Sequence, residues 1–394
     1  MKKILLTLLV MVALTGIVSA EGAEGGIVLP QIPVTSVDTG GRLIFSDSPE
    51  YVKEDGILYA DTVQGEARVL YYHLNDSPTN KKFAVILENI DGKTVGITVK
   101  RRGDGTPNAE NYLVLGKETQ TSYYARHIPH SMELEPGEKC LLSERMDSRV
   151  VKPQELVYGV YDFFAGGRIK VTVLAYPTNA NPYKFMVNAP ILPADEMHLR
   201  GTFDNMTRII TAKRPLNLNA AHSKGACLIL ADDDGDKYRR GVDALDGTVA
   251  VNQGNYGIDY WLDIPVQGAG KSKYILTPLG GSYAGAMRVH SRQKRSRLTQ
   301  TPEGQIWFGD VPLSEADENK QAELLRQGKG IYFPHGEQTL LGEFNNNDRV
   351  LFEFSPPGAS NLPVNFIILP VPEEKQSVRR PHFFDRTFAP RQPR

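Results

Sequence analysis

The sequence predicts an all-β protein built from two tandem, homologous β-sandwich domains, with one short helix in the second domain. Short runs of β-branched and aromatic residues, bounded by Gly, Pro, Asn and Asp, recur along the whole chain. The pattern of the first half returns in the second half in the same order. The chain has 394 residues, more than one hydrophobic core usually serves, so two domains are expected.

The first twenty residues, MKKILLTLLVMVALTGIVSA, predict a cleaved signal peptide. Lys2 and Lys3 precede a short apolar run, and Ala20 ends a cleavage site of small residues. The apolar run is shorter than a membrane-spanning helix requires, and no later segment is apolar enough to cross a bilayer. We therefore expect an extracytoplasmic protein, whether secreted, periplasmic or at the cell surface, with no transmembrane segment in the mature chain.

Changes in composition set the expected domain boundaries. After the signal peptide we expect a linker over 21–40, a first sandwich over 41–176, a Pro-rich linker over 177–196, a second sandwich over 197–372 and a disordered basic tail over 373–394.

The strands of the first domain are expected at 68–74, 83–87, 95–100, 156–161 and 168–174, and those of the second at 226–230, 256–262, 274–276, 350–354 and 364–369. The helix is expected over 314–327, because Ser314 is a suitable N-cap and Gly328 a suitable stop.

Four segments of the first half match four of the second half in chain order. They are Tyr72-His-Leu-Asn with Tyr260-Trp-Leu-Asp, Gly92-Lys-Thr-Val-Gly-Ile-Thr-Val-Lys with Gly280-Gly-Ser-Tyr-Ala-Gly-Ala-Met-Arg-Val (one residue longer), Val157-Tyr-Gly-Val-Tyr with Val350-Leu-Phe-Glu-Phe, and Val171-Thr-Val-Leu-Ala-Tyr-Pro with Val364-Asn-Phe-Ile-Ile-Leu-Pro. The order and the nearly constant spacing indicate an internal duplication.

Two glycine-rich motifs of the second half suggest catalysis but are better explained as turns. Gly268-Ala-Gly-Lys-Ser resembles the end of a phosphate-binding loop, yet Pro265 stands where that loop needs a glycine amide. Gly280-Gly-Ser-Tyr-Ala-Gly resembles a nucleophile elbow, yet Ala284 replaces the final glycine. A strand rather than a helix is expected after each motif, so we expect no catalytic residue in either.

An acidic segment is the metal candidate. Asp232, Asp234 and Asp236 alternate, and Asp243 holds the twelfth position, as in calcium-binding loops. Lys237 stands where an EF-hand needs glycine, so the candidate is a non-EF-hand calcium loop. The alternative is a solvated acidic turn. No other cofactor is expected.

A basic segment is the candidate site for an anionic ligand. It contains Arg288, Arg292, Lys294, Arg295 and Arg297. Such a run can bind acidic envelope polymers, and the alternative is an exposed hairpin without a ligand. The formal net charge of −1 gives no general attraction to nucleic acid, so no nucleic-acid partner is expected.

Aromatic residues offer a second kind of contact, the stacking of sugars. The candidates are Tyr71, Tyr72, Tyr123, Tyr124, Tyr260 and Trp261. Alternation along a strand turns about half of each adjacent pair inward, so most should belong to the core. The two cysteines, Cys140 and Cys227, fall one in each half. They are either a disulfide, which export permits, or two small buried residues.

Three glycine-rich segments carry a family resemblance. Gly254-Asn-Tyr-Gly257, Gly280-Gly-Ser-Tyr-Ala-Gly285 and Gly358-Ala-Ser-Asn-Leu-Pro363 resemble uncharacterised exported bacterial envelope proteins with tandem β-domains. Some of those carry a copper-amine-oxidase-like N-terminal domain, which is absent here. The resemblance implies a role in the envelope, and no functional residue carries over from it.

We therefore expect an exported, non-enzymatic protein that binds or organises cell-envelope material, either a wall glycan or a surface protein. The alternatives are a hydrolase of envelope polysaccharide and a structural module that self-associates through its strand edges.

Overall fold

The computed structural model describes residues 26–219, 222–279, 281–293, 295–309 and 315–372. The expected signal peptide, the tail over 373–394 and the N-cap Ser314 lie outside these residues. The all-β fold class is confirmed, because the described residues form 25 strands and only four helices. Among them, no helix combines the length and apolarity that membrane crossing needs.

The elements that begin before residue 197 are β1 (Ile27–Pro30), β2 (Val34–Thr39), β3 (Arg42–Ser46), β4 (Tyr51–Val52), β5 (Gly56–Asn75), β6 (Lys81–Asn89), β7 (Val95–Asp104), α1 (Tyr112–Tyr124), β8 (His130–Leu134), β9 (Lys139–Leu141), α2 (Glu144–Ser148), β10 (Leu156–Pro177) and α3 (Pro182–Asn188).

The later elements are β11 (Arg200–Phe203), β12 (Thr207–Ala212), β13 (Leu216–Asn217), β14 (Ala226–Leu230), β15 (Arg239–Val242), β16 (Val249–Asn252), β17 (Asp259–Asp263), β18 (Val266–Gln267), β19 (Lys271–Pro278), β20 (Gly285–Ser291), β21 (Arg297–Thr301), α4 (Glu315–Arg326), β22 (Lys329–Tyr332), β23 (Thr339–Asn345), β24 (Val350–Phe354) and β25 (Val364–Val371).

The first sandwich is built on two long strands that run through both of its layers. β5 has 20 residues and β10 has 22, and they pair antiparallel along nearly their whole length. Their register shifts between Ala165 and Ile169, opposite Gly65. The φ of Gly65 is +82°, in the left-handed region that glycine adopts more easily than other residues. This bend lets one layer follow the order β11-β3-β5-β10-β7-β8 and the other the order β5-β10-β6-β9.

The second sandwich has separate strands where the first has long ones. One layer follows the order β2-β12-β17-β24-β20-β21 and the other the order β14-β25-β19-β23. Buried side chains such as Tyr260, Leu262, Phe352 and Phe366 fill the space between the layers. Around β14 and β25, a smaller cluster joins Leu29 of β1 and Tyr332 of β22 to the same sheet.

The predicted duplication is confirmed by the strand orders. The layer β3-β5-β10-β7-β8 corresponds to β12-β17-β24-β20-β21, and β5-β10-β6-β9 corresponds to β14-β25-β19-β23. Three of the four matched segments fall on corresponding strands: β5 with β17, and the two ends of β10 with β24 and β25. The described part of the fourth match begins before β7 and before β20 and leads into these two corresponding strands. The glycines of the first motif, 268–270, lie in the bend before β19, and residues 281–284 of the second motif lie before β20. Gly280 lies outside the described residues.

The edge strands are exchanged between the two halves. β2 precedes β3 in the chain but pairs antiparallel with β12, whereas β11 precedes β12 but pairs antiparallel with β3. The β15–β16 hairpin then extends the first sheet beyond β11. The expected linker over 21–40 is therefore wrong, because it contains β1 and β2. The boundary at 197 is wrong as well, because composition does not show which sheet offers an edge to a strand.

The expected Pro-rich linker over 177–196 is packed onto the first sandwich. Asn181 caps α3 by accepting a hydrogen bond from the amide of Lys184. Leu192 is buried, and its amide donates to the carbonyl of Ile57. The proline-rich segment therefore packs against the sheet of the first sandwich and does not act as a spacer between two domains.

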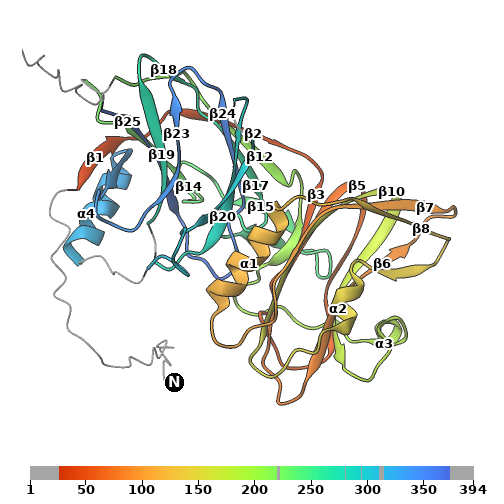
Figure 1. Cartoon of the computed structure of the whole chain (residues 1–394). Helices are drawn as coiled ribbons and strands as arrows, with labels where there is room; N and C mark the ends of the chain where they lie inside the picture. Colours follow the sequence, from red (N-terminus) through yellow and green to blue (C-terminus); the bar gives the residue numbers. More distant parts are fainter. Residues whose placement is uncertain (1–25, 220–221, 280, 294, 310–314, 373–394) are drawn as a thin grey trace, which may run out of the picture.

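Helix α1 lies between the two sandwiches, and the sequence did not predict it (Figure 1). Asn111 caps it through the amides of Leu113 and Val114. The helix contacts β7 and β10 of the first half and β20 and β21 of the second. Because both of its sides are buried, its sequence lacks the one-sided apolar stripe by which surface helices are recognised.

We expect the Gly116→Ala substitution in α1 to destabilise the protein, against the usual preference of helices for alanine. A Cβ atom at Gly116 would lie 2.4 Å from the carbonyl oxygen of Gly358 in the second half. The free energy of unfolding, measured in urea, should fall by about 1–3 kcal/mol. Gly96→Ala is the matched control, because a Cβ there meets nothing within 4 Å. Equal stability of the two variants would contradict this tight contact.

Candidate functional site

A fully buried ion pair of the first half lies where the two halves meet. Arg68 on β5 faces Asp162 on β10, and its Nε and Nη2 atoms donate to the two carboxylate oxygens at 2.6 and 3.0 Å. The remaining nitrogen, Nη1, donates to the carbonyl oxygens of Met206 and Gly257 at 3.2 and 2.7 Å. The side chain of Arg68 thus reaches from the first sandwich to backbone groups of the second.

Arg101 extends this ion pair to the surface. Its side chain is 28% exposed and lies over the ring of Tyr123, 5.0 Å from the ring centre. Its nitrogens lie 3.3 Å from Asp162, 3.4 Å from Asp259 and 2.5 Å from Glu353. Three carboxylates from both halves therefore surround two guanidinium groups, and each oxygen atom of Asp259 and Glu353 has a hydrogen-bond partner.

The second half contributes two carboxyl groups to this cluster, Asp259 and Glu353, and their pKa values are shifted in opposite directions. Burial and the nearby charge of Glu353 raise the pKa of Asp259 to about 6, although Arg101 and Arg68 act against this. Burial also acts to raise the pKa of Glu353, but the hydrogen bond from His290 and the charge of Arg101 outweigh it and hold that pKa below its usual value. The cluster therefore accepts its first proton in mildly acidic solution.

One side of the layer β2-β12-β17-β24-β20-β21 carries exposed side chains, and we call this side the outer face. Strand register places Val37, Ile209 and Trp261 side by side on it. Val37 is 60% exposed and Ile209 is 38% exposed. The next two strands continue the row with Glu353 and Arg288. An apolar strip thus ends in an acidic and a basic group.

Trp261 is the centre of the outer face, and the charged cluster holds it in place. Its ring nitrogen donates to Asp259 at 3.2 Å. Its ring stacks on His290 with the ring centres 5.1 Å apart and the planes 19° apart. His290 in turn lies 2.9 Å from an oxygen of Glu353. A half-exposed indole fixed on two sides is suited to stack on a flat apolar surface.

Of the six aromatic candidates, only Trp261 is on the surface. The five tyrosines, Tyr71, Tyr72, Tyr123, Tyr124 and Tyr260, are buried. Tyr260 and Trp261 are adjacent, so alternation along β17 turns one inward and the other outward, as expected. The charged cluster behind Trp261 gave no sequence signal, because its members lie far apart in the chain.

The structure does not assemble the expected calcium loop. One Asp236 oxygen accepts from Tyr260 and from the amide of Ala231, and the other pairs with Arg208. Asp232 accepts from the amides of Asp234 and Asp236, which closes a turn. The carboxylates of Asp232 and Asp236 therefore do not point toward a common position, because each accepts hydrogen bonds from different donors.

Asp243, the fourth expected calcium ligand, belongs to another part of the molecule. It is fully buried, and one of its oxygens lies 2.6 Å from Nε of Arg200 and 3.0 Å from Nε2 of His198. Its neighbours there include His198 and Asp246. Among the described residues, these three side chains form a group whose potential metal-ligand atoms all lie within 4.8 Å of one another.

The expected anion site falls on the β20–β21 hairpin. Arg288 is half-buried on β20 beside Glu353, and Arg297 pairs with Glu303 at 3.2 Å. Arg292 and Arg295 are exposed at the turn, and neither has an ion-pair partner among the described residues. Lys294 lies outside the described residues. The hairpin therefore presents two uncompensated cations next to the outer face.

The two cysteines are free thiols, so the disulfide alternative is wrong. Cys140 lies 3.3 Å from the sulfur of Met132, and Cys227 is buried beside Leu29. Burial raises the pKa of Cys140 to about 11 and that of Cys227 to about 12. Neither thiol is suited to nucleophilic chemistry.

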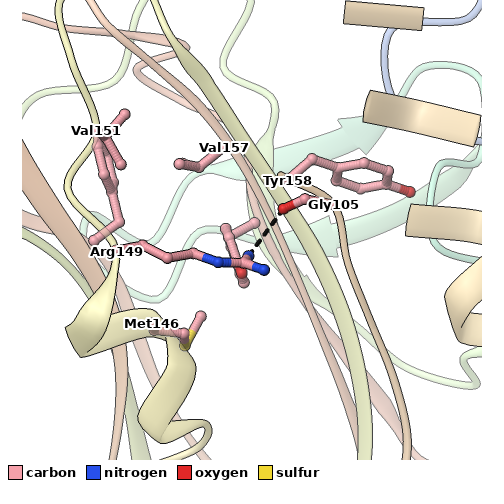
Figure 2. A pocket seen from close by; sticks show the side chains of 8 residues that line it. Gly105, Met146, Arg149, Val151, Val157 and Tyr158 are labelled. Carbon is pink, nitrogen blue, oxygen red and sulfur yellow. Dashed lines mark hydrogen bonds between the residues drawn. The ribbon is translucent and has the colours of Figure 1, made fainter. Parts of the chain in front are cut away.

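A cavity of about 20 Å³ lies inside the first sandwich, and Figure 2 shows its lining. Arg149 points into it and donates to the carbonyl of Gly105 at 2.9 Å. Met146, Val151 and Val157 form its apolar walls. This volume holds about one water molecule and is far below that of a small-molecule pocket.

Comparison with known proteins adds no family. No family model and no curated protein matches this chain. Among solved structures, a mutant of Bacillus subtilis oxalate decarboxylase is 10% identical over 85% of this chain and 78% of that chain, with a TM-score of 0.11. At that TM-score the likeness supports no argument about fold or function.

We expect Asp259→Asn to change how stability depends on pH. The pKa of Asp259 is higher in the folded protein than in the unfolded chain, so its ionisation destabilises the fold. Between about pH 4 and pH 7, the free energy of unfolding of the wild type should fall relative to that of the variant, by up to about 3 kcal/mol. Urea unfolding at four pH values measures this, and parallel pH curves for the two proteins would contradict it.

Proposed function

We propose that this protein is exported and binds an anionic cell-envelope glycan on its outer face, without catalysis. The observation that carries the proposal is the half-exposed Trp261, held by Asp259 and stacked on His290. Sugar rings have an apolar face that packs on indole, and their hydroxyl groups need polar partners around it. The apolar strip of Val37 and Ile209 lengthens the surface available to a chain of sugars.

The basic hairpin supports an anionic ligand. Arg292 and Arg295 lie in the turn between β20 and β21, at the edge of the layer that carries Trp261, and neither has an ion-pair partner among the described residues. In this proposal a polymer bound along the outer face contacts both Trp261 and these cations. Charges at an exposed turn add affinity and speed of association that fall as salt is added. An acidic surface protein could use the same cations, and it is the alternative ligand.

Two other functions remain as alternatives. The unequal proton affinities of Asp259 and Glu353 favour a hydrolase in one respect, because an acid and a base need such a difference. Both carboxyl groups are at most 3% exposed and their oxygens are already hydrogen-bonded, which favours a supporting role. A self-associating module would instead use the edge strands β21 and β23.

We expect Trp261→Ala to weaken binding to purified cell-wall sacculi by about tenfold or more, because a central aromatic anchor is lost. Co-sedimentation of residues 21–394 measures this, with released sugar assayed in the same tubes. Trp307→Ala is the matched control, since Trp307 is the other tryptophan of the chain and lies outside the sheets. Equal loss in both variants, or none in either, would contradict the assignment. Released sugar would favour the hydrolase.

Replacement of Arg292 and Arg295 by glutamine should remove most of the salt dependence of binding. The wild type should release sacculi as salt rises from about 0.05 to 0.5 M, because screening shortens the reach of surface charges to a few ångströms. The double variant should bind more weakly at low salt and change little as salt is added. The Arg326→Gln variant, on α4, is the control. An unchanged salt dependence in the double variant would show that the hairpin does not contact the polymer.

A further inference from the structure

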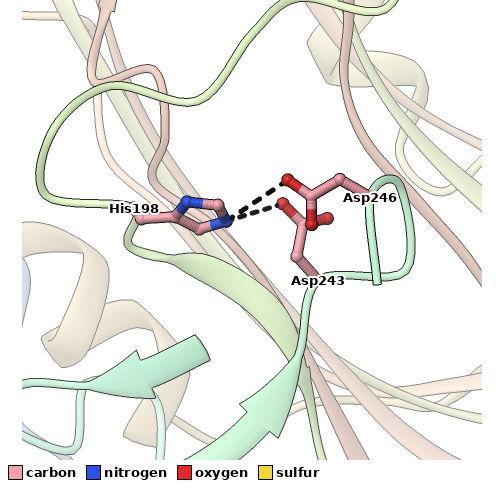
Figure 3. A group of neighbouring side chains, drawn as sticks. All are labelled: His198, Asp243 and Asp246. Carbon is pink, nitrogen blue, oxygen red and sulfur yellow. Dashed lines mark hydrogen bonds and ion pairs between the residues drawn. The ribbon is translucent and has the colours of Figure 1, made fainter. Parts of the chain in front are cut away.

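His198, Asp243 and Asp246 meet beside the first sandwich, as Figure 3 shows. His198 lies in the turn before β11, and the two aspartates lie in the loop between β15 and β16. The Nε2 atom of His198 lies 3.0 Å from Asp243 and 3.7 Å from Asp246. The hydroxyl oxygen of Thr248 lies 3.1 Å from the same nitrogen. Four potential ligand atoms therefore converge from two segments that are far apart in the chain.

Around Nε2 of His198 there are more hydrogen-bond acceptors than hydrogens available to donate to them. Thr248 donates its hydroxyl hydrogen to the other oxygen of Asp246 at 2.6 Å, so toward His198 its oxygen is an acceptor. A neutral imidazole has at most one hydrogen on Nε2, and three oxygens surround that atom. In the tautomer with the hydrogen on Nδ1, Nε2 carries a lone pair that faces the three oxygens. A cation at this point would satisfy the nitrogen and the oxygens together.

The ligand side chains are fixed by bonds outside the group. Asp243 accepts from Arg200 with one oxygen and from the amide of Leu245 with the other. The amide of His198 donates to Asp195 at 3.1 Å. Arg200 itself is buried and donates to the carbonyls of Leu58 and Leu192. Outer partners of this kind orient the ligands of protein metal sites.

We propose that His198, Asp243 and Asp246 bind one Zn²⁺ ion, with Thr248 beside it. One imidazole nitrogen and two carboxylates form the mixed set that zinc accepts, whereas calcium takes oxygen ligands only. The positive charge of Arg200 lowers the affinity, so binding is weaker than at a closed structural zinc site. The ion ties the β15–β16 hairpin to the turn that leads into β11, and so strengthens the edge of the first sandwich.

Isothermal titration of metal-free protein, residues 21–394, with Zn²⁺ tests the proposal. We expect one ion per chain, and at least tenfold weaker binding in both Asp246→Asn and His198→Gln. Because Asp246 is exposed, we expect Asp246→Asn to keep the fold. This variant therefore tests the proposal even if His198→Gln fails to fold. Asp234→Asn is the matched control, because Asp234 is an exposed carboxylate of the expected calcium loop.

Saturable Zn²⁺ binding that Asp246→Asn weakens and Asp234→Asn preserves is the expected result. Zn²⁺ should also raise the midpoint of thermal unfolding of the wild type, and not that of Asp246→Asn, because it binds only the folded state. The proposal is overturned if the wild type does not bind Zn²⁺, or if both aspartate variants bind it equally well. It is also overturned if Ca²⁺ binds more tightly than Zn²⁺ and Asp234→Asn removes that binding.

Discussion

The buried pair of Arg68 and Asp162 is the interaction on which the rest of this structure depends. A guanidinium group without water is stable only when its hydrogens find acceptors, and removal of one partner from such a pair costs about 3–5 kcal/mol. Here the acceptors come from both halves: one carboxylate from β10, and the carbonyls of Met206 and Gly257 from the second half. The requirement to satisfy Arg68 therefore holds the two sandwiches in one arrangement.

The same requirement positions the outer face. Asp162 also contacts Arg101, and Arg101 contacts Asp259 and Glu353 across the boundary between the halves. These two carboxylates hold the ring nitrogen of Trp261 and the imidazole that stacks on it. The interaction that unites the halves thus continues, contact by contact, to the side chain that we propose stacks on a glycan.

Local pattern was enough to predict the β class and the duplication, because each follows from alternation or repetition along the chain. Alternation also predicted that one of Tyr260 and Trp261 points inward, but not which one. It did not predict the exchange of β2 and β11, since the partner of an edge strand depends on a distant sheet. Asp243 shows the same limit: its spacing from Asp232 resembles a calcium loop, but Arg200 and His198 decide where it points. Helix α1 gave no one-sided pattern, because both halves bury it.

Native-state hydrogen exchange tests most directly whether Arg68 makes the two halves one cooperative unit. The slowest amides of β10 and of β25 should exchange with the same free energy of opening, and Arg68→Met should lower both by a similar amount, about 3–5 kcal/mol. If the variant lowers the protection of β10 and leaves that of β25 unchanged, the halves unfold separately. That result would contradict a shared dependence on the buried pair.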